Sequence, residues 1–311
     1  MTRMICGVDV AAQTLQARIG AQGAQQSFAN HAEGIAELAA FCRQHQVELV
    51  VMEATGGYEQ MAYALLWEQG LEVAIVNPLA VRRFAQSMGH LEKTDALDAG
   101  VIAHYAATKN VQPQPPASAT QQKLRALVTH LRQLTVTRVQ LRQQQRLVGE
   151  PMVLASFQRM LDCLEQEEER LEEAIAELIS ADPLWQKLNE SFRQIKGVAS
   201  RTVARLMAEM PEMGTVSNKA IAKLAGLAPL ANDSGRMQGR RAVRGGRRHV
   251  REVLYVVAGI VCRFDAHFQA FAQRLLEAGK PKKVVRIAVA RKLLVRLNAR
   301  AREVRAAFAC A

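Results

Sequence analysis

The sequence predicts an α/β domain at the N-terminus, a helical coiled-coil hairpin and a mainly α-helical, basic C-terminal domain. Three observations support this fold class. Short apolar runs alternate with helical patterns over residues 1–110, two long heptad patterns follow, and positive charge is concentrated in residues 182–311. Strands that alternate with helices are typical of a layered fold whose sheet contains parallel pairs.

The first region has the pattern of a small sheet with helical connections. Three short runs rich in Val, Ile and Met are predicted as buried strands: Arg3 to Val10, Val47 to Met52 and Leu71 to Val76. Apolar residues at helical spacing occupy Ala32 to His45 and Tyr58 to Gln69. Thr14 to Gly20 follows the first strand closely, and we expect it to return as an antiparallel partner.

The middle of the chain predicts a linker and a helical hairpin. Gln112 to Pro116 contains three prolines and is typical of a linker. Apolar residues then recur at heptad spacing from Leu124 to Val148 and from Leu154 to Leu178. Arg138 occupies one position of the first pattern, and Glu168 occupies one position of the second. A coiled-coil hairpin fits, with two ordinary bundle helices as the alternative. The predicted division is 1–111, a linker over 112–119, a hairpin over 120–181 and a basic domain over 182–311.

The distribution of charge indicates where a polyanion would bind. The chain carries a formal charge of +12, yet residues 1–110 hold 7 Lys and Arg against 11 Asp and Glu. Residues 182–311 hold 26 basic and 9 acidic residues. Such an excess favours nucleic acid as the partner. The two hairpin arms carry opposite charge, which favours a homo-oligomer, a dimer or a tetramer, formed through residues 120–181.

Cysteine usage and hydropathy indicate the compartment. The five cysteines lack the short spacing of a zinc site or a redox motif, and we expect reduced thiols: Cys6, Cys42, Cys163, Cys262 and Cys310. No apolar stretch approaches the length of a membrane span, and no signal-peptide pattern opens the chain. We therefore expect no membrane association and a cytoplasmic protein, associated with the nucleoid when bound to DNA.

Four carboxylates form the first candidate site. Asp9 lies at the end of the first predicted strand, Glu53 follows the second, and Asp95 and Asp98 are spaced to share one face of a helix. Converging carboxylates repel one another unless cations neutralise them, and oxygen ligands suit Mg²⁺, with Mn²⁺ as an alternative. Two such ions can flank a scissile phosphate. For each carboxylate taken singly, a structural role at a strand end or helix start remains the alternative.

Basic residues around a serine form the second candidate site. The turn at Gly197 opens a predicted helix whose N–H groups can face a phosphate, although a plain turn between helices is equally consistent. An Arg-rich and Gly-rich segment follows Ser234, and arginine offers a planar fork to phosphate. The predicted nucleic-acid contacts are Lys196, Arg201, Arg236, Arg240, Arg241, Arg244, Arg247, Arg248 and Arg251. Taken from the sequence alone, Asp-Ser-Gly is first of all a turn signature.

These motifs resemble one family over nearly the whole chain and in order. In the first half they are Asp9, the run Glu53-Ala-Thr-Gly-Gly-Tyr58, Asn77-Pro78 and Lys93-Thr-Asp-Ala-Leu-Asp98. In the second half they are Gly197-Val198-Ala199, Ala225 to Pro229, Asp233-Ser234-Gly235 and the Arg-rich segment through Leu254-Tyr255. The chain resembles the Asp-Glu-Asp-Asp (DEDD) insertion-sequence transposases, whose N-terminal domain is RNase H-like and of the RuvC type.

The resemblance implies DNA cleavage and strand exchange. It implies Mg²⁺ held by Asp9, Glu53, Asp95 and Asp98, and Ser234 as the nucleophile. It also implies a coiled-coil assembly arm, a composite site from two subunits and a structured non-coding RNA that guides target choice. Two alternatives stay open: a RuvC-like nuclease or junction resolvase that uses water, and a non-catalytic nucleic-acid-binding protein.

Overall fold

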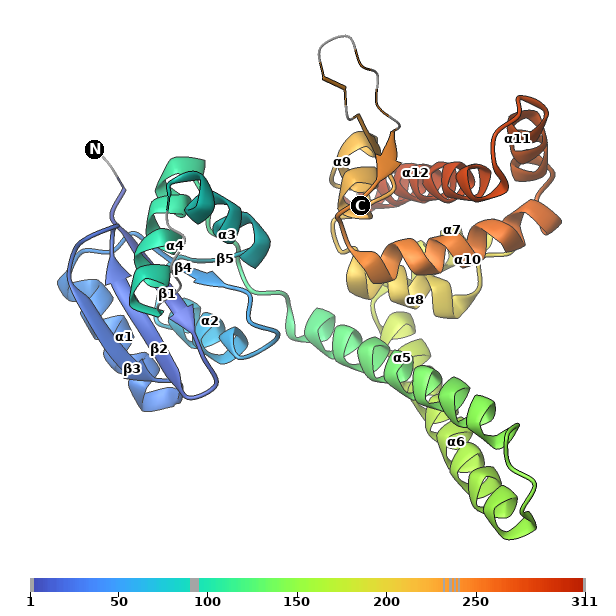
Figure 1. The fold of residues 1–311 in the computed structure, drawn as a ribbon, viewed down its shortest axis with the longest axis horizontal. Helices are drawn as coiled ribbons and strands as arrows, with labels where there is room; N and C mark the ends of the chain where they lie inside the picture. Colours follow the sequence, from blue (N-terminus) through green and yellow to red (C-terminus); the bar gives the residue numbers. More distant parts are fainter. Residues whose placement is uncertain are drawn as a thin grey trace. The chain divides into compact units, whose positions relative to one another are not determined.

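The computed structural model describes residues 3–89, 95–231, 233, 234, 237, 239 and 241–309, without the side chains of residues 95–97. The chain forms two compact units, Met1–Ala117 and Ser118–Ala311. The first is built on a sheet and the second on helices (Figure 1). This arrangement confirms a mixed α/β N-terminal part followed by a helical C-terminal part.

The first unit contains a five-stranded mixed sheet in the order β3-β2-β1-β4-β5. The strands are β1 (Ile5–Val10), β2 (Thr14–Ile19), β3 (Gln25–Ala29), β4 (Leu49–Glu53) and β5 (Val73–Val76). β1, β4 and β5 run parallel, while β2 pairs antiparallel with both β1 and β3. The three predicted strands are therefore confirmed, and so is the antiparallel pairing of the segment Thr14 to Gly20 with the first strand.

Helices cover both faces of this sheet. α1 (Ala32–Gln44) and α2 (Glu59–Glu68) pack on one face with the even-numbered side chains of β1. α3 (Pro78–Ser87) and α4 (Asp95–Lys109) pack on the other, where Ile102, Ala103 and Ala106 of α4 are buried. Each parallel strand is thus apolar on both faces, which explains the continuous apolar runs in the sequence.

The edge strand β3 was not predicted from the sequence. Its residues Gln-Gln-Ser-Phe-Ala are polar at three positions, and these three side chains are exposed. Phe28 is the buried member. An edge strand with a mostly solvated surface lacks the apolar run that identifies a central strand.

The second unit consists of helices and one small hairpin of strands. Its helices are α5 (Ala119–Gln145), α6 (Pro151–Ala181), α7 (Pro183–Arg193), α8 (Ser200–Glu209), α9 (Asn218–Leu224), α10 (Arg248–Phe264), α11 (Ala266–Glu277) and α12 (Lys282–Ala309). β6 (Pro229–Leu230) pairs antiparallel with β7 (Ala242–Val243). Val289, Leu293 and Leu297 of α12 are fully buried in the core of this unit.

α5 and α6 extend side by side from this core as a long helical hairpin (Figure 1). The charged residues that occupy positions of the two heptad patterns pair with each other. The Arg138 Nε donates to the Glu168 Oε1 at 3.0 Å, and the Arg201 Nη2 of α8 lies 3.4 Å from the Glu168 Oε2. Glu168 is only 2% exposed, so its carboxylate pairs with these arginines inside the contact between α5, α6 and α8. The coiled-coil geometry itself stays a prediction.

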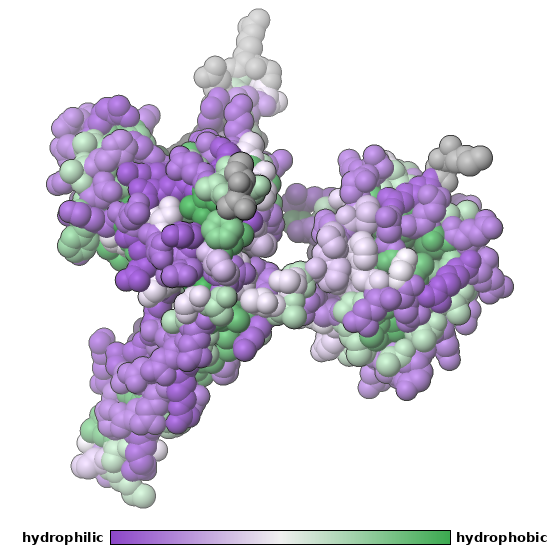
Figure 2. Space-filling view, turned by 180° about the vertical axis from the view of Figure 1, so that it is seen from behind, coloured by the Kyte–Doolittle hydropathy of each residue, from purple (hydrophilic) through white to green (hydrophobic). Residues whose placement is uncertain are grey.

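The surface of the helical hairpin is largely hydrophilic. Figure 2 shows hydrophilic residues along most of it, with apolar residues near its end. Leu147 and Met152, which flank the turn, are 88% and 81% exposed. Among the described residues no single helix is long and apolar enough to cross a membrane. α10 and α11 pass that test only as a pair, bent by 104°.

Candidate active site

The sheet places Asp9 and Glu53 next to each other. In the parallel ladder of β1 and β4, Val8 is the partner of Met52, so the next residues along the two strands are Asp9 and Glu53. Paired residues of neighbouring strands point to the same face of a sheet. Both carboxylates therefore lie at the carboxyl edge of adjacent parallel strands, as the sequence predicts, and both are half-buried.

The face that Asp9 and Glu53 share is the one covered by α4. Asp9 is on the same side of β1 as Ile5 and Gly7, and Ile5 packs in the core with Ile102 and Ala106 of α4. At Gly7 the helix touches the strand, since a Cβ there would lie 2.0 Å from the carbonyl oxygen of Ala99. Glycine is required at this position because the α4 backbone occupies the space of a side chain.

α4 runs antiparallel to β1, which brings its first turn toward the carboxylates. The Arg3 Nη1 at the start of β1 donates to the carbonyl oxygen of Val111, just beyond the end of α4, while Ala99 lies over Gly7. Asp98 precedes Ala99 and is half-buried, so it lies at the same end of the sheet as Asp9. The N-terminus of a helix also carries partial positive charge, which favours anionic groups there.

Asp95 is the first residue of α4, and its side chain lies outside the described part of the chain. Lys93 and Thr94 of the same motif lie outside the described residues. Among the described side chains, no group of three or more His, Cys, Asp or Glu is arranged to hold a metal ion. Asp9, Glu53 and Asp98 each interact with other groups in the chain. Carboxylate oxygens from two strand ends and one helix start are the donor set that hard divalent cations prefer.

Glu59 organises the loop that follows Glu53, a role the sequence reasoning missed. Its Oε2 accepts hydrogen bonds from the backbone N–H groups of Thr55 and Gly57 at 3.1 and 2.9 Å, and from the Thr55 hydroxyl at 3.0 Å. Burial raises the pKa of Glu59, but hydrogen bonds from the Gln60 side chain and from the backbone outweigh it and lower the pKa to about 2. An acidic residue at a helix start, two positions after a Gly-Gly pair, was the available signal.

Asn30 connects this loop with the end of β1. Its Nδ2 donates to the carbonyl oxygens of Ala11 at 2.9 Å and of Tyr58 at 3.1 Å. Ala11 follows the last residue of β1, and Tyr58 precedes α2 with its side chain 57% exposed. The segments that follow the two carboxylate-bearing strands are therefore held together by hydrogen bonds.

Ser234 lies in the segment that connects β6 and β7. Its N–H donates to the carbonyl oxygen of Met237 at 3.0 Å, and the Met237 N–H donates back at 2.9 Å. The Asp233 Oδ1 accepts from the Gly239 N–H at 3.1 Å. These bonds place Ser234 at a turn, which the Asp-Ser-Gly signature indicates, and its side chain is exposed.

The base of this hairpin is closed by two glycines. A Cβ on Gly226 would lie 2.1 Å from the carbonyl oxygen of Gly245, and one on Gly246 would lie 2.3 Å from the Gly226 nitrogen. Both residues have positive φ angles, 64° and 67°. At these two positions glycine lets the backbone of one segment approach the backbone of the other closely.

The predicted nucleic-acid contacts fall into three groups. Arg201 and Arg247 bind acidic side chains of their own unit: Arg201 pairs with Glu168 and Glu172, and the Arg247 Nη1 donates to the Glu212 Oε2 at 2.7 Å. The exposed members are Lys196, Arg241, Arg244 and Arg248, of which Arg248 also pairs with Glu252, while Arg251 is half-buried and donates to the carbonyl oxygen of Gly245 at 2.7 Å. Arg236 and Arg240 lie outside the described residues.

Part of the positive charge of α12 is used within the fold. The Arg302 Nη2 donates to the carbonyl oxygen of Val216 at 3.1 Å, and the Arg305 Nε donates to that of Met213 at 2.8 Å.

The Gly197 turn leads into α8, whose cap residue Ala199 makes no side-chain hydrogen bond to the helix. Its first N–H groups therefore lack the side-chain acceptor that a polar cap would supply.

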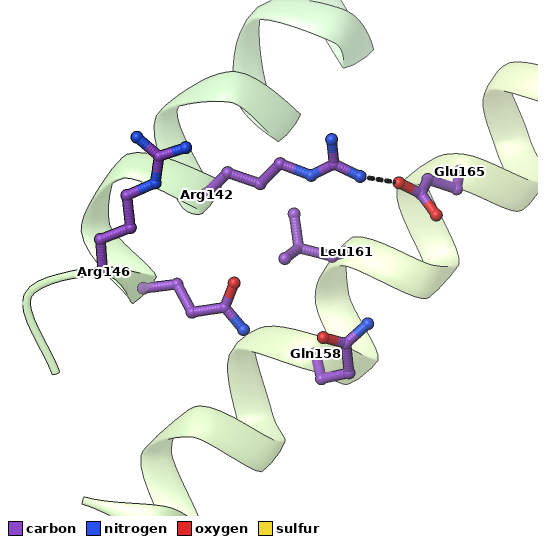
Figure 3. Close-up of a pocket in the computed structure, with 6 residues that line it drawn as sticks. Arg142, Arg146, Gln158, Leu161 and Glu165 are labelled. Carbon is purple, nitrogen blue, oxygen red and sulfur yellow. Dashed lines mark hydrogen bonds and ion pairs between the residues drawn. The ribbon is translucent and has the colours of Figure 1, made fainter. Parts of the chain in front are cut away.

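A small surface pocket lies on the helical hairpin. Figure 3 shows Arg142 of α5 directed toward Glu165 of α6, with an ion pair between them. Arg146, Gln158 and Leu161 also line the pocket. The pocket contains neither the predicted carboxylates nor Ser234, and Arg142 and Glu165 pair across the two helices.

Comparison with known proteins identifies the class of this chain. The sequence pattern of a DEDD transposase family of the IS110 type matches residues 6–148, and that of the transposase IS116/IS110/IS902 family matches residues 189–273. The pilin gene-inverting proteins of Moraxella bovis and Moraxella lacunata are each 30% identical over 310 residues, covering 94% of either chain. The RuvC structure of Thermus thermophilus aligns with 36% of this chain and 99% of its own at 17% identity, with a TM-score of 0.26.

These matches make the protein a DNA-rearranging enzyme. The chain belongs to the IS110 family of DEDD transposases. It is thus an enzyme that cleaves and rejoins DNA, and DNA is its macromolecular partner, as the sequence motifs predict.

Proposed function

We propose that this transposase exchanges DNA strands with a serine nucleophile, Ser234, and with Mg²⁺ bound by Asp9, Glu53, Asp95 and Asp98. The observation that carries the proposal is the placement of the carboxylates. Asp9 and Glu53 are neighbours at one sheet edge, and α4 directs the turn that contains Asp98 to the same edge and face. A mixed sheet with acidic residues at the ends of β1 and β4 supports the RNase H-like, RuvC-like assignment of this unit.

The carboxylates supply the metal ligands in this proposal. When bound, Mg²⁺ stabilises the negative charge that develops on the phosphate oxygens during transfer, and Mn²⁺ is the alternative ion. The protein's contribution is orientation. β1 and β4 hold Asp9 and Glu53 through the register of a buried sheet, the bonds of Glu59 and Asn30 fix the loops behind them, and α4 holds Asp98.

Ser234 supplies the covalent step. Its Oγ attacks the phosphorus, a P–Oγ bond forms as the bond to one deoxyribose oxygen breaks, and the hydroxyl proton leaves while the departing oxygen gains a proton. The hydroxyl of the incoming strand then attacks the phosphoserine and releases Ser234. Exposure of Ser234 at a turn supports this role, because a nucleophile on a hairpin can enter a site built by other residues.

Two further elements complete the proposal. The excess of basic residues in 182–311 suits a structured guide RNA as well as DNA, and the oppositely charged hairpin arms support a homo-oligomer formed through residues 120–181. The two Moraxella relatives are named for inverting a pilin gene, which supports a site-specific rearrangement as the reaction. Lys196, Arg241, Arg244 and Arg248 remain the exposed candidates for phosphate contacts among the described residues.

A strand-exchange assay with full-length protein, element DNA and co-purified RNA tests this function. Asp9→Asn is expected to abolish Mg²⁺-dependent exchange while DNA binding stays within about twofold of the wild type, since the basic unit is unchanged. Ser234→Ala is expected to abolish both exchange and the protein-DNA adduct on a denaturing gel.

Ser27→Ala, which alters an exposed serine of β3, is the matched control and should behave like the wild type. Strand cleavage that survives in Ser234→Ala would identify a water-dependent nuclease instead. Unchanged exchange in Asp9→Asn would identify the carboxylates as structural.

A further inference from the structure

Basic side chains from three helices of the second unit form a group that includes His249, within the Arg-rich segment, and two arginines outside that segment. Arg132 of α5, Arg205 of α8 and His249 of α10 form this group, here named the junction cluster. The Arg132 Nη1 lies 3.0 Å from the Nδ1 and 2.9 Å from the Nε2 of His249. Arg205 lies on α8, which packs against both α5 and α10, and the charge of Arg132 lowers its pKa.

The contact between Arg132 and His249 does not satisfy the hydrogen-bond donors of the guanidinium group well. A guanidinium N–H can point along the lone pair of only one ring nitrogen, yet the Arg132 Nη1 is equally near both. A neutral imidazole has one acceptor nitrogen, and a protonated one has none. The packing of the three helices therefore holds a donor against a group that satisfies it poorly.

The acidic residues nearby are mostly engaged elsewhere. Glu252 pairs with Arg248 at 2.7 Å and lies 3.6 Å from the His249 Nδ1. Glu168 and Glu172 pair with Arg201. In the part of the chain that the structure describes, no ion pair within 4.0 Å involves Arg132 or Arg205.

Arg205 is held in a setting that disfavours its charge. Burial lowers its pKa first of all, the charges of Glu209 and Glu252 raise it, and those of Arg132 and Arg201 lower it. Arg132 is itself half-buried, and its Nε lacks a hydrogen-bond partner. Like charges crowded at a partly dehydrated surface are stabilised when an anion binds between them.

We propose that the junction cluster of Arg132, Arg205 and His249 binds one phosphodiester group of a nucleic-acid backbone. Two guanidinium groups offer several N–H donors to the phosphate oxygens, and the imidazole adds one more. The surrounding helices fix these side chains, so the site is a positioning contact on the backbone and carries no base readout. This site rests on the proposed nucleic-acid role of the second unit, and it extends the binding surface to α5 and α8.

Salt-dependent binding of the full-length protein tests the site. Arg132→Gln, Arg205→Gln and the double variant are measured against a short duplex DNA and a separate RNA stem-loop. Each single variant is expected to weaken binding about three- to tenfold and to reduce the slope of log K against log salt by about 0.9 for duplex, the value of one phosphate contact. Because both arginines contact the same phosphate, the double variant should lose about the same slope as each single one.

Arg170→Gln is the charge-matched control, since Arg170 is an exposed residue of α6 that pairs with Glu167 within its own helix. Arg132→Lys keeps the charge and removes the planar fork, and it is expected to recover part of the affinity. Intrinsic fluorescence of Trp185, the tryptophan of this unit, confirms that each variant is folded.

The two probes identify the source of the phosphodiester. An effect on duplex DNA alone or on RNA alone assigns the site to that nucleic acid, and either supports the proposal. If the cluster variants match Arg170→Gln on both probes, the proposal is overturned. Failure of the catalytic proposal has a different readout, since Asp9→Asn would then leave strand exchange intact. Asp9→Asn is expected to leave the salt slopes unaltered whether or not the catalytic proposal holds.

Discussion

The two units hold their chemically important residues in different ways. In Met1–Ala117 the carboxylates sit on the ends of buried strands, and the core determines where they point. In Ser118–Ala311 the serine lies on an exposed turn, and several arginines are already bound to acidic or carbonyl groups. The first arrangement suits a metal site with fixed geometry. The second suits a surface that binds a large polyanion. On such a surface the sequence does not reveal which basic side chains are already paired within the protein.

The largest effect is expected from the carboxylates. Glu53→Gln and Asp98→Asn should each reduce strand exchange at least about a thousandfold, because a neutral amide binds a divalent cation weakly. DNA affinity should change less than about twofold. Quantitative exchange assays and binding titrations on the same preparations check this. Glu48→Gln, at an exposed residue before β4, is the control, and an equal loss in that variant would contradict a specific metal site.

A smaller effect is expected at the charged pair of the helical hairpin. Glu168→Gln removes the buried carboxylate that pairs with Arg138 and Arg201 and leaves Arg138 with the longer, 3.5 Å pair to Glu165, and it should cost about 3 kcal/mol of unfolding free energy. Denaturant unfolding of a Trp67→Phe background, in which Trp185 is the remaining tryptophan, reports on this unit.

Glu169→Gln, at the exposed neighbouring position, should change the unfolding free energy by less than about 0.5 kcal/mol. A similar cost for Glu168→Gln and Glu169→Gln would show that Arg138 does not depend on the buried carboxylate.

A substitution at Gly7 tests the sheet unit separately from the helical one. Gly7→Ala forces a Cβ against the Ala99 carbonyl oxygen, so α4 must shift, and we expect a loss of about 1–3 kcal/mol in the first unit alone. A Trp185→Phe background, read through Trp67, measures it. Strand exchange should fall as well, since α4 contains Asp98. Gly149→Ala has open space around the new methyl group and should be neutral. Full strand-exchange activity in a destabilised Gly7→Ala variant would show that the site does not depend on the position of α4.

The effect expected from Glu59 depends on pH. The folded-state pKa of about 2 lies below the ordinary 4.5, so the ionised form stabilises the fold fully above pH 4.5 and loses this contribution as the pH falls toward 2. Glu59→Gln should therefore destabilise the first unit by about 2 kcal/mol at pH 7, and the difference from wild type should shrink below pH 4.5. A pH-independent difference would assign the effect to packing.

Much of the sheet unit was predictable because its signals are local. β1, β4 and β5 are apolar on both sides, and a strand end followed by a carboxylate is visible in the sequence at Asp9 and at Glu53. β3 was missed because its exposed residues are polar. The role of Glu59 was missed because it comes from backbone N–H groups that converge only after the Gly-Gly turn folds.

The basic unit was less predictable because charge does not reveal its partner. Arg201 and Arg247 are both among the predicted nucleic-acid contacts, yet their acidic partners lie 29 to 35 residues away in the chain. Arg132 and His249 are separated by 117 residues, so no local pattern marks the junction cluster. The coiled-coil geometry, the individual nucleic-acid contacts and the catalytic residues stay predictions.

The most direct measurement is mass spectrometry of the covalent intermediate. Full-length protein is incubated with Mg²⁺, co-purified RNA and element DNA nicked so that rejoining is blocked, and the adduct is digested with nuclease and protease. The expected result is a nucleotide remnant on the Ser234 peptide in the wild type, and none in Asp9→Asn or Ser234→Ala. Efficient cleavage without any adduct, or an adduct on a different residue, would contradict a mechanism in which the acidic and the basic unit each supply half of the chemistry.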